Sequence, residues 1–235
     1  MNSNIHSILD TDMKRLKIES NIKKRKFHVI NPGLNLWERF DESKKPTAMA
    51  GSMGILKGDI ILKEMRKAIA SFTTLSKQQR LFLEVFTQSN LKNIYKDEFK
   101  SNELQIKETN MIDVINTRSL VCCPRRFGKT ESVSIFSACA LWAMPDCEIV
   151  IISPSKRQSE MMSTRIKIHL KKMLDKGFIF EKGPRDNNEI YTIIRDGTTR
   201  TVRNIGSNPE TARGIGGDII ICEEAAALAV NFFLA

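Results

Sequence analysis

The apolar positions in the second half of the chain predict an alternation of buried strands and helices. Continuous apolar runs at 119–123 (SLVCC), 147–153 (CEIVIIS) and 218–222 (DIIIC) are typical of strands buried on both faces. The patterns at 130–144 and 155–174 predict an amphipathic helix and a helix with a basic face. Strands joined through helices in this way indicate an α/β protein whose mainly parallel sheet has helices on both faces.

Other segments depart from this alternation. Residues 190–194 and 199–205 flank an Asp-Gly pair at 196–197, which is typical of a tight turn, so we predict an antiparallel hairpin. A helical pattern covers 60–86. Residues 92–110 are so polar that we expect them on the surface.

The first 58 residues have weak apolar periodicity and many cations. We expect a basic, mobile N-terminal arm at 1–58 and one packed domain at 59–235. Four consecutive cations in the arm would suit contact with nucleic acid phosphates or nuclear import: Lys23, Lys24, Arg25 and Lys26. A solvated basic tail explains the same cluster without any partner.

The composition excludes several classes of protein. A hydrophobic share of 41% is too high for a wholly disordered chain. No apolar run reaches membrane-spanning length and the N-terminus lacks a signal-peptide core, so we expect an intracellular protein with no membrane partner. Five scattered cysteines, three histidines and no CxxC motif indicate reduced thiols rather than a disulfide framework or a zinc site.

The segment CPRRFGKT, at 123–130, lies between a predicted strand and a predicted helix, as a phosphate-binding Walker A loop does. Backbone N–H groups at the helix start would face the phosphates, and Gly128 would let the backbone approach them closely. Lys129 would reach the β- and γ-phosphates, and the Thr130 hydroxyl would ligate magnesium. The usual first glycine of the motif is replaced by Cys123. The alternative is an ordinary strand–turn–helix joint with a surface lysine.

Two arginines add positive charge inside this loop. Arg125 and Arg126 could spread positive charge over a departing γ-phosphate. They could equally form a surface pair that contacts DNA or a neighbouring acid.

The run DIIICEE, at 218–224, has the form of a Walker B strand, in which two acids follow a buried strand. In open α/β sheets, ligands bind at this carboxyl edge. Glu223 would hold magnesium, although an aspartate is usual at this position, and Glu224 would orient and deprotonate the attacking water. The alternative is that the two acids cap the next helix. Loop and strand end together predict a P-loop NTPase of the ASCE (RecA-like) type.

These motifs resemble the ATPase part of the large terminase subunit, the DNA-packaging motor of tailed phages and herpesviruses. The resemblance covers about 75–228 and includes LSKQQRLFL, CCPRRFGKT, ISPSKRQSEMM with Gln158, and an Arg213-Gly214 pair before the acidic strand. It implies that Gln79 contacts adenine and that Arg125 is a catalytic or sensing arginine. The implied catalytic residues are Glu224, Arg125 and Lys129. The implied nucleotide contacts are Gln79, Cys123, Pro124, Arg125, Arg126, Phe127, Gly128, Lys129 and Thr130, and the implied magnesium ligands are Thr130 and Glu223.

The resemblance also implies cofactors and partners. ATP and Mg²⁺ would drive movement of double-stranded DNA, bound without sequence preference, and the net charge of +10 suits such a partner. Self-association into a ring, a portal, a small terminase subunit and an infected host cell as the location are expected. A candidate DNA contact is the basic stretch 165–172, although a solvated helix face is an equal alternative; its cations are Arg165, Lys167, Lys171 and Lys172.

The family continues past the acidic strand with a coupling motif and an RNase H-type nuclease domain. Because this sequence ends at Ala235, we expect a fragment or the product of a split gene. One alternative is a superfamily 2 helicase-like ATPase, which would need Asp-Glu-x-His at the acidic strand end and a second RecA-like lobe. The other is a non-catalytic nucleotide- or DNA-binding fragment that needs a partner polypeptide.

Overall fold

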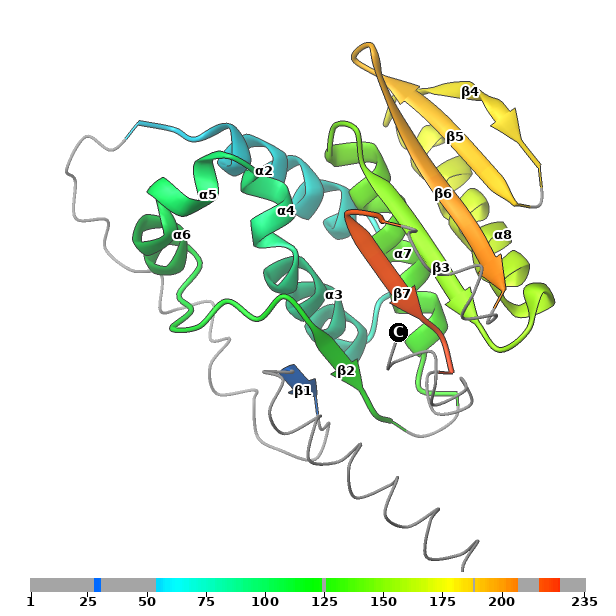
Figure 1. The fold of residues 1–235 in the computed structure, drawn as a ribbon, viewed down its shortest axis with the longest axis horizontal. Coiled ribbons are helices and arrows are strands. Elements are labelled where there is room, and N and C mark those ends of the chain that lie inside the picture. The colour runs from blue at the N-terminus through cyan, green and yellow to red at the C-terminus, as the bar shows by residue number, and fades with distance from the viewer. Residues whose placement is uncertain (1–27, 31–53, 124–125, 188, 207–215, 225–235) are drawn as a thin grey trace, which may run out of the picture.

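The computed structural model describes residues 28–30, 54–123, 126–187, 189–206 and 216–224. Its main feature is a five-stranded sheet with the strand order β4-β5-β6-β3-β7 (Figure 1). These strands span Glu181–Asp186 (β4), Ile190–Arg195 (β5), Thr198–Gly206 (β6), Glu148–Ser153 (β3) and Ile219–Cys222 (β7).

The sheet is mixed, although we predicted a mainly parallel one. Strand β3 runs parallel to both of its neighbours, β6 and β7. Strands β4, β5 and β6 pair antiparallel, which confirms the predicted hairpin between β5 and β6. Strand β4 was not predicted, since its sequence EKGPRD has neither an apolar run nor alternation.

The strand before the phosphate loop lies outside the five-stranded sheet. Strand β2 (Ser119–Val121) pairs parallel with β1 (His28–Ile30) in a separate two-stranded sheet. Because β6 and β7 occupy both edges of β3, β2 could join that sheet only beside an edge strand, β7 or β4, and it pairs with β1 instead. The expectation of one sheet containing all three apolar runs is therefore wrong for the described residues. The rest of the predicted N-terminal arm, up to residue 53, lies outside the described residues.

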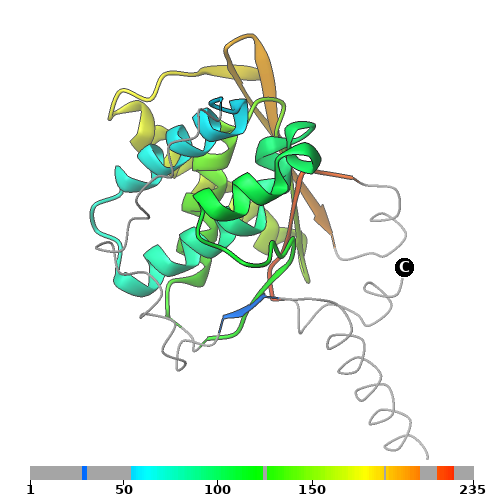
Figure 2. The same ribbon diagram turned by 90° about the vertical axis from the view of Figure 1, so that its left-hand side faces the viewer.

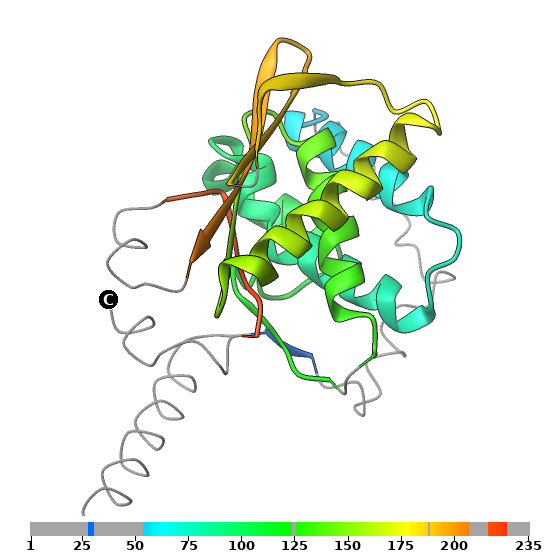
Figure 3. The same cartoon turned by 90° about the vertical axis from the view of Figure 1, so that its right-hand side faces the viewer.

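Two helices connect the sheet to the rest of the molecule. Helices α7 (Lys129–Ala143) and α8 (Lys156–Leu174) pack against each other and contact β3 and β6. Figures 2 and 3 show both helices on the same side of the sheet. Within the described residues, the helical cover thus lies on one face rather than both, and the helix predicted after β7 lies outside them.

Helix α7 is buried almost all round, whereas its sequence predicted an amphipathic helix. Besides the sheet and α8, it contacts α2 (Lys57–Ala70) and α3 (Lys77–Ser89), so little of its surface reaches water. Three serines can be buried because each hydroxyl donates to a backbone carbonyl three or four residues earlier, at 2.8–2.9 Å. They are Ser132, Ser134 and Ser137.

Residues 92–110 are less exposed than predicted. They form parts of three short helices, α4 (Leu91–Tyr95), α5 (Glu98–Ser101) and α6 (Glu103–Thr109). Tyr95, Phe99 and Ile106 are buried in the main core. The Tyr95 hydroxyl donates to Asp59 at 2.6 Å, and its burial beside that carboxylate raises its pKa. Sparse apolar residues in a polar segment therefore suffice to anchor it.

The β5–β6 hairpin is fixed to the end of α7 by two arginines. Arg200, only 2% exposed, donates to the backbone carbonyls of Met144, at 3.2 Å, and Thr198, at 2.8 Å, and also to that of Arg195. The guanidinium of Arg195 lies 3.8 Å from the centre of the Trp142 ring.

None of the helices in the described ranges is both long and apolar enough to cross a membrane.

Candidate functional site

The loop between β2 and α7 has the backbone geometry that a glycine must supply. Gly128 has φ +83° and precedes the first residue of α7. A Cβ at this position would also lie 2.8 Å from the side-chain nitrogen of Gln79. Arg126 also has a positive φ, of 65°. The positive φ and the lack of space for a Cβ therefore both favour glycine at 128. Pro124 and Arg125 lie outside the described residues.

The side chain of Lys129 folds back over its own loop. Its Nζ donates to the backbone carbonyl of Cys123 at 2.9 Å. Burial raises the pKa of the Cys123 thiol, although the nearby Lys129 charge partly offsets this effect. The lysine is thus held at the mouth of the loop by one neutral carbonyl, which an anionic ligand could replace.

Thr130 and Glu223 meet across a separation of 93 residues. The Thr130 hydroxyl donates to Oε1 of Glu223 at 2.7 Å. Thr130 is the second residue of α7, and Glu223 directly follows β7. The N–H of Glu223 donates to the carbonyl of Ile152 at 2.9 Å, which continues the β3–β7 ladder by one bond and fixes the start of the acidic pair. The structure therefore brings together the two residues that the sequence assigned to magnesium.

A cavity of about 600 Å³ opens beside these residues. Its wall comes from the phosphate loop, the start of α7, the β3–α8 connection, α8 and the end of β7, through Arg126, Phe127, Gly128, Lys129, Thr130, Glu131, Pro154, Gln158, Arg165 and Glu224. Glu224 adopts a left-handed conformation, with φ 51°. Most of the predicted loop residues and the predicted base therefore line one cavity.

The cavity offers hydrogen-bond donors for a phosphate chain and lies beside oxygen ligands for a hard cation. The first N–H groups of a helix have no partner within the helix, and here the first intrahelical bond runs from Ser132 N–H to the Gly128 carbonyl. The Thr130 hydroxyl and the Glu223 carboxylate are oxygen ligands of the kind that Mg²⁺ prefers. No group of three or more His, Cys, Asp or Glu side chains in the described part of the chain is placed to hold a metal. A magnesium ion here would thus need ligands from the nucleotide and water as well.

Gln79 lies beside the loop but outside the residues that line the cavity. Its Oε1 accepts from the Ser76 N–H at 2.9 Å, and the Ser76 hydroxyl accepts from the Gln79 N–H at 3.2 Å. This capping box begins α3 and aims the carboxamide nitrogen at Gly128. The adenine contact implied for Gln79 stays a prediction.

One feature of the site, a contact between α7 and α8, was not predicted from the sequence. Glu131, next to Thr130, lies 3.3 Å from Nη1 of Arg165 and 3.3 Å from Nε2 of His169. Arg165 and His169 are four residues apart, so they share one face of α8. That spacing is readable in the sequence, but nothing in it indicates which helix start the two side chains face.

Proteins similar to this chain were found among solved structures. No protein-family model and no curated protein matches the sequence. Among solved structures, the chain is similar to the large terminase ATPase domain of Thermus phage P74-26, with a TM-score of 0.43 and 21% identity over 48% of this chain and 50% of that chain. It is also similar to the large terminase of a thermophilic bacteriophage in complex with ADP, with a TM-score of 0.36 and 19% identity over 47% of this chain and 27% of that chain. This chain thus spans half the length of the first protein and about a quarter of the second.

Proposed function

We propose that this chain is a magnesium-dependent ATPase, the motor part of a large terminase subunit that drives viral DNA into capsids. The observation that carries the proposal is the 2.7 Å contact between Thr130 and Glu223, beside Lys129 and at the edge of a cavity of about 600 Å³. An ordinary strand–turn–helix joint has no need to bring a helix-start hydroxyl to an acid at a distant strand end. A Walker A loop and a Walker B strand require that meeting.

Each residue of the site has a role in this proposal. Lys129 and the N–H groups at the start of α7 would bind the β- and γ-phosphates. Thr130 and Glu223 would hold magnesium, which would supply positive charge to those phosphates. Glu224 lines the cavity and would orient and deprotonate the attacking water. Arg126 lines the same cavity and can add positive charge, and the same role is proposed for Arg125.

Two substitutions test this assignment with different readouts. Lys129→Ala should abolish ATP binding measured by calorimetry, because it removes the lysine that would reach the phosphates. Glu224→Gln should preserve binding and lower hydrolysis by about 100-fold or more, the usual scale for a positioned base. Unchanged ATP affinity in Lys129→Ala would refute the nucleotide site. Parental hydrolysis in Glu224→Gln would refute the role of this acid and favour the helix-cap interpretation.

Duplex DNA is the proposed macromolecular partner, and the ion pairs on α8 support a smaller candidate contact than the whole basic stretch 165–172. Of the four cations predicted on α8, Arg165 pairs with Glu131 and Lys167 pairs with Asp186 at 2.6 Å. Lys171 and Lys172 are exposed and have no ion-pair partner among the described residues. We therefore propose that these two lysines contact DNA phosphates.

A salt titration tests this surface. Binding should weaken linearly in log affinity against log salt, without preference for one sequence. Replacing Lys171 and Lys172 by alanine should lower the slope by about 2, because each lost phosphate contact removes about 0.9. An unchanged slope would show that Lys171 and Lys172 do not contact DNA.

We also propose an assembly for this motor. Several copies of the chain would form a ring on a portal, together with a small terminase subunit, in an infected cell.

A further inference from the structure

A cation from α8 lines the same cavity as the phosphate loop's own lysine. Arg165 lines this cavity together with Lys129, Thr130 and Glu224, although it lies 35 residues after Thr130 and on another helix. It also lines a second cavity of about 560 Å³ along α8. The Arg165–Glu131 pair belongs to the walls of both cavities.

The bond that holds Arg165 in this structure is a weak one. Its Nη1 lies 3.3 Å from Oε2 of Glu131, and the two side chains are 45% and 37% exposed. Strong charge-assisted bonds are shorter, about 2.7–2.9 Å. Ion pairs this open to water contribute little to stability. Arg165 can therefore leave Glu131 at low cost when a better anion enters the cavity.

Glu131 keeps a partner when Arg165 leaves. Its other oxygen lies 3.3 Å from Nε2 of His169, which is 2% exposed and packs edge-on against Phe72. Burial lowers the pKa of His169 and so favours its uncharged ring, although the neighbouring Glu131 carboxylate partly offsets this effect. When Arg165 leaves, the Glu131 carboxylate thus still has the Nε2 atom of His169 within 3.3 Å.

We propose that Arg165 is the residue that makes this site prefer a nucleoside triphosphate to a diphosphate. This inference rests on the proposed ATPase function. With a triphosphate in the cavity, the guanidinium exchanges Glu131 for the oxygens of the terminal phosphate. A diphosphate lacks that phosphoryl group, so Arg165 stays on Glu131. The planar guanidinium suits this role, because it can donate two parallel hydrogen bonds to a phosphate.

The test compares two ligands, ADP and the β,γ-imido analogue of ATP, each with magnesium. We expect Arg165→Ala to weaken the triphosphate analogue by about tenfold, the scale of one charge-assisted bond, and ADP by less than about threefold. Arg165→Lys should lie in between, because it keeps the charge and loses the fork. Glu131→Gln should preserve or raise affinity for the triphosphate analogue, because it releases Arg165.

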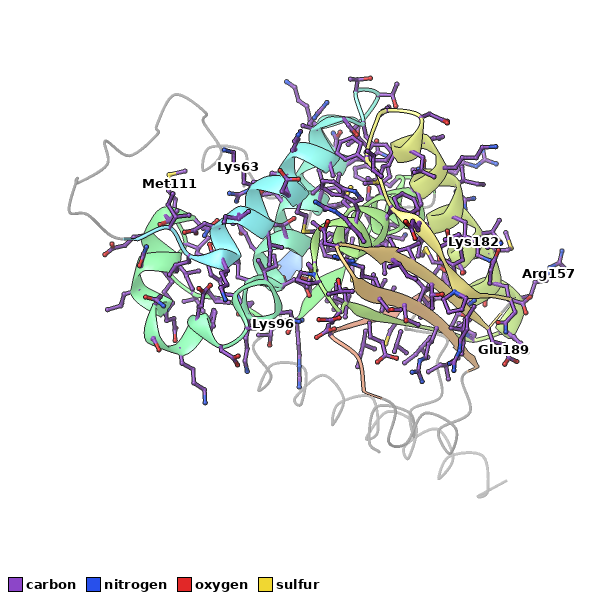
Figure 4. All side chains as sticks on the ribbon, turned by 90° about the horizontal axis from the view of Figure 1, so that it is seen from above. Lys63, Lys96, Met111, Arg157, Lys182 and Glu189 are labelled. Atoms are coloured by element: carbon purple, nitrogen blue, oxygen red, sulfur yellow. The ribbon has the colours of Figure 1, made fainter. Side chains whose placement is uncertain are left out.

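A residue that only ties α8 to α7 would give a different pattern. In that case Arg165→Ala and Glu131→Gln would weaken both ligands equally and lower the melting temperature alike, and this result would overturn the inference. Lys63→Ala is the charge-matched control, since Lys63 is exposed on α2, far from Arg157 at the start of α8 in Figure 4. If the parental chain bound neither ligand, both the proposed function and the proposed role of Arg165 would be refuted. If it bound both and Arg165→Ala kept their affinity ratio, only this inference would fail.

Discussion

The Thr130–Glu223 contact can be tested without any nucleotide, by shortening the acid. Glu223→Asp removes one methylene and retracts the carboxylate by about 1.5 Å, the length of one C–C bond. Starting from 2.7 Å, the two oxygens would then lie about 4 Å apart, beyond hydrogen-bond range. The perturbation keeps the charge and removes the contact.

The structure sets the size of the effect. A hydrogen bond to a charged group contributes about 1.5–3 kcal/mol when it is well shielded from water. Thr130 and Glu223 are both only partly buried, so we expect about 1 kcal/mol here. A loss of this size would lower the melting temperature by about 2–4 °C in a chain of this length.

A double-mutant cycle isolates this contact from other effects of each substitution. Urea unfolding of the parental chain, Glu223→Asp, Thr130→Val and the double variant, followed by circular dichroism in a chelating buffer, should give a coupling free energy of about 1 kcal/mol. A coupling below about 0.3 kcal/mol, the usual error of additivity, would refute the contact. Because the loop is built around the longer acid, Glu223→Asp should also lower ATP turnover several-fold, and an increase would show that glutamate is merely tolerated.

Three further substitutions test other parts of the structure. Gly128→Ala should lower the unfolding free energy by about 1–2 kcal/mol, from the positive φ and the clash with Gln79, and in a Gln79→Ala background only the backbone part of this loss should remain. Burial lowers the folded-state pKa of His169, so its contribution to stability is present above the unfolded pKa and is lost as pH falls through the folded pKa. The urea midpoint should therefore drop more between pH 7 and 5.5 for the parental chain than for His169→Gln, and equal drops would contradict this. Arg200→Met removes the hydrogen bonds that three backbone carbonyls accept from this arginine, and should lower the unfolding free energy by about 3 kcal/mol. A loss under about 1 kcal/mol in urea unfolding would show that water or other donors replace the arginine.

Elements whose signals are local could be predicted from the sequence. The apolar run of β3, the helical pattern of α8 and the turn between β5 and β6 are each specified within about 20 residues, and the structure has all three. Helix α8 even begins with a capping box, since Ser155 and Gln158 bond each other's backbone N–H groups. Neighbouring residues alone decide such features, so no knowledge of the fold is needed.

The pairing of Thr130 with Glu223 was also predictable, because each residue belongs to a recognisable sequence motif. A glycine-lysine-threonine at a helix start and two acids at a strand end each have a characteristic local pattern. Their meeting also requires the start of α7 to lie at the carboxyl end of β7, which the Thr130–Glu223 contact shows.

Other features depended on contacts between distant segments. The sequence of α7 reads as one-sided, yet α2, α3, α8 and the sheet surround it. The separation of β2 from the main sheet is likewise visible only in the structure, where β2 pairs with β1 and β3 pairs with β6 and β7. Arg165 reads as one of several surface cations until the crossing of α8 over the start of α7 brings it to Glu131 and the cavity. Strand order and helix crossings result from burying apolar surface over the whole domain, and no short segment carries that information.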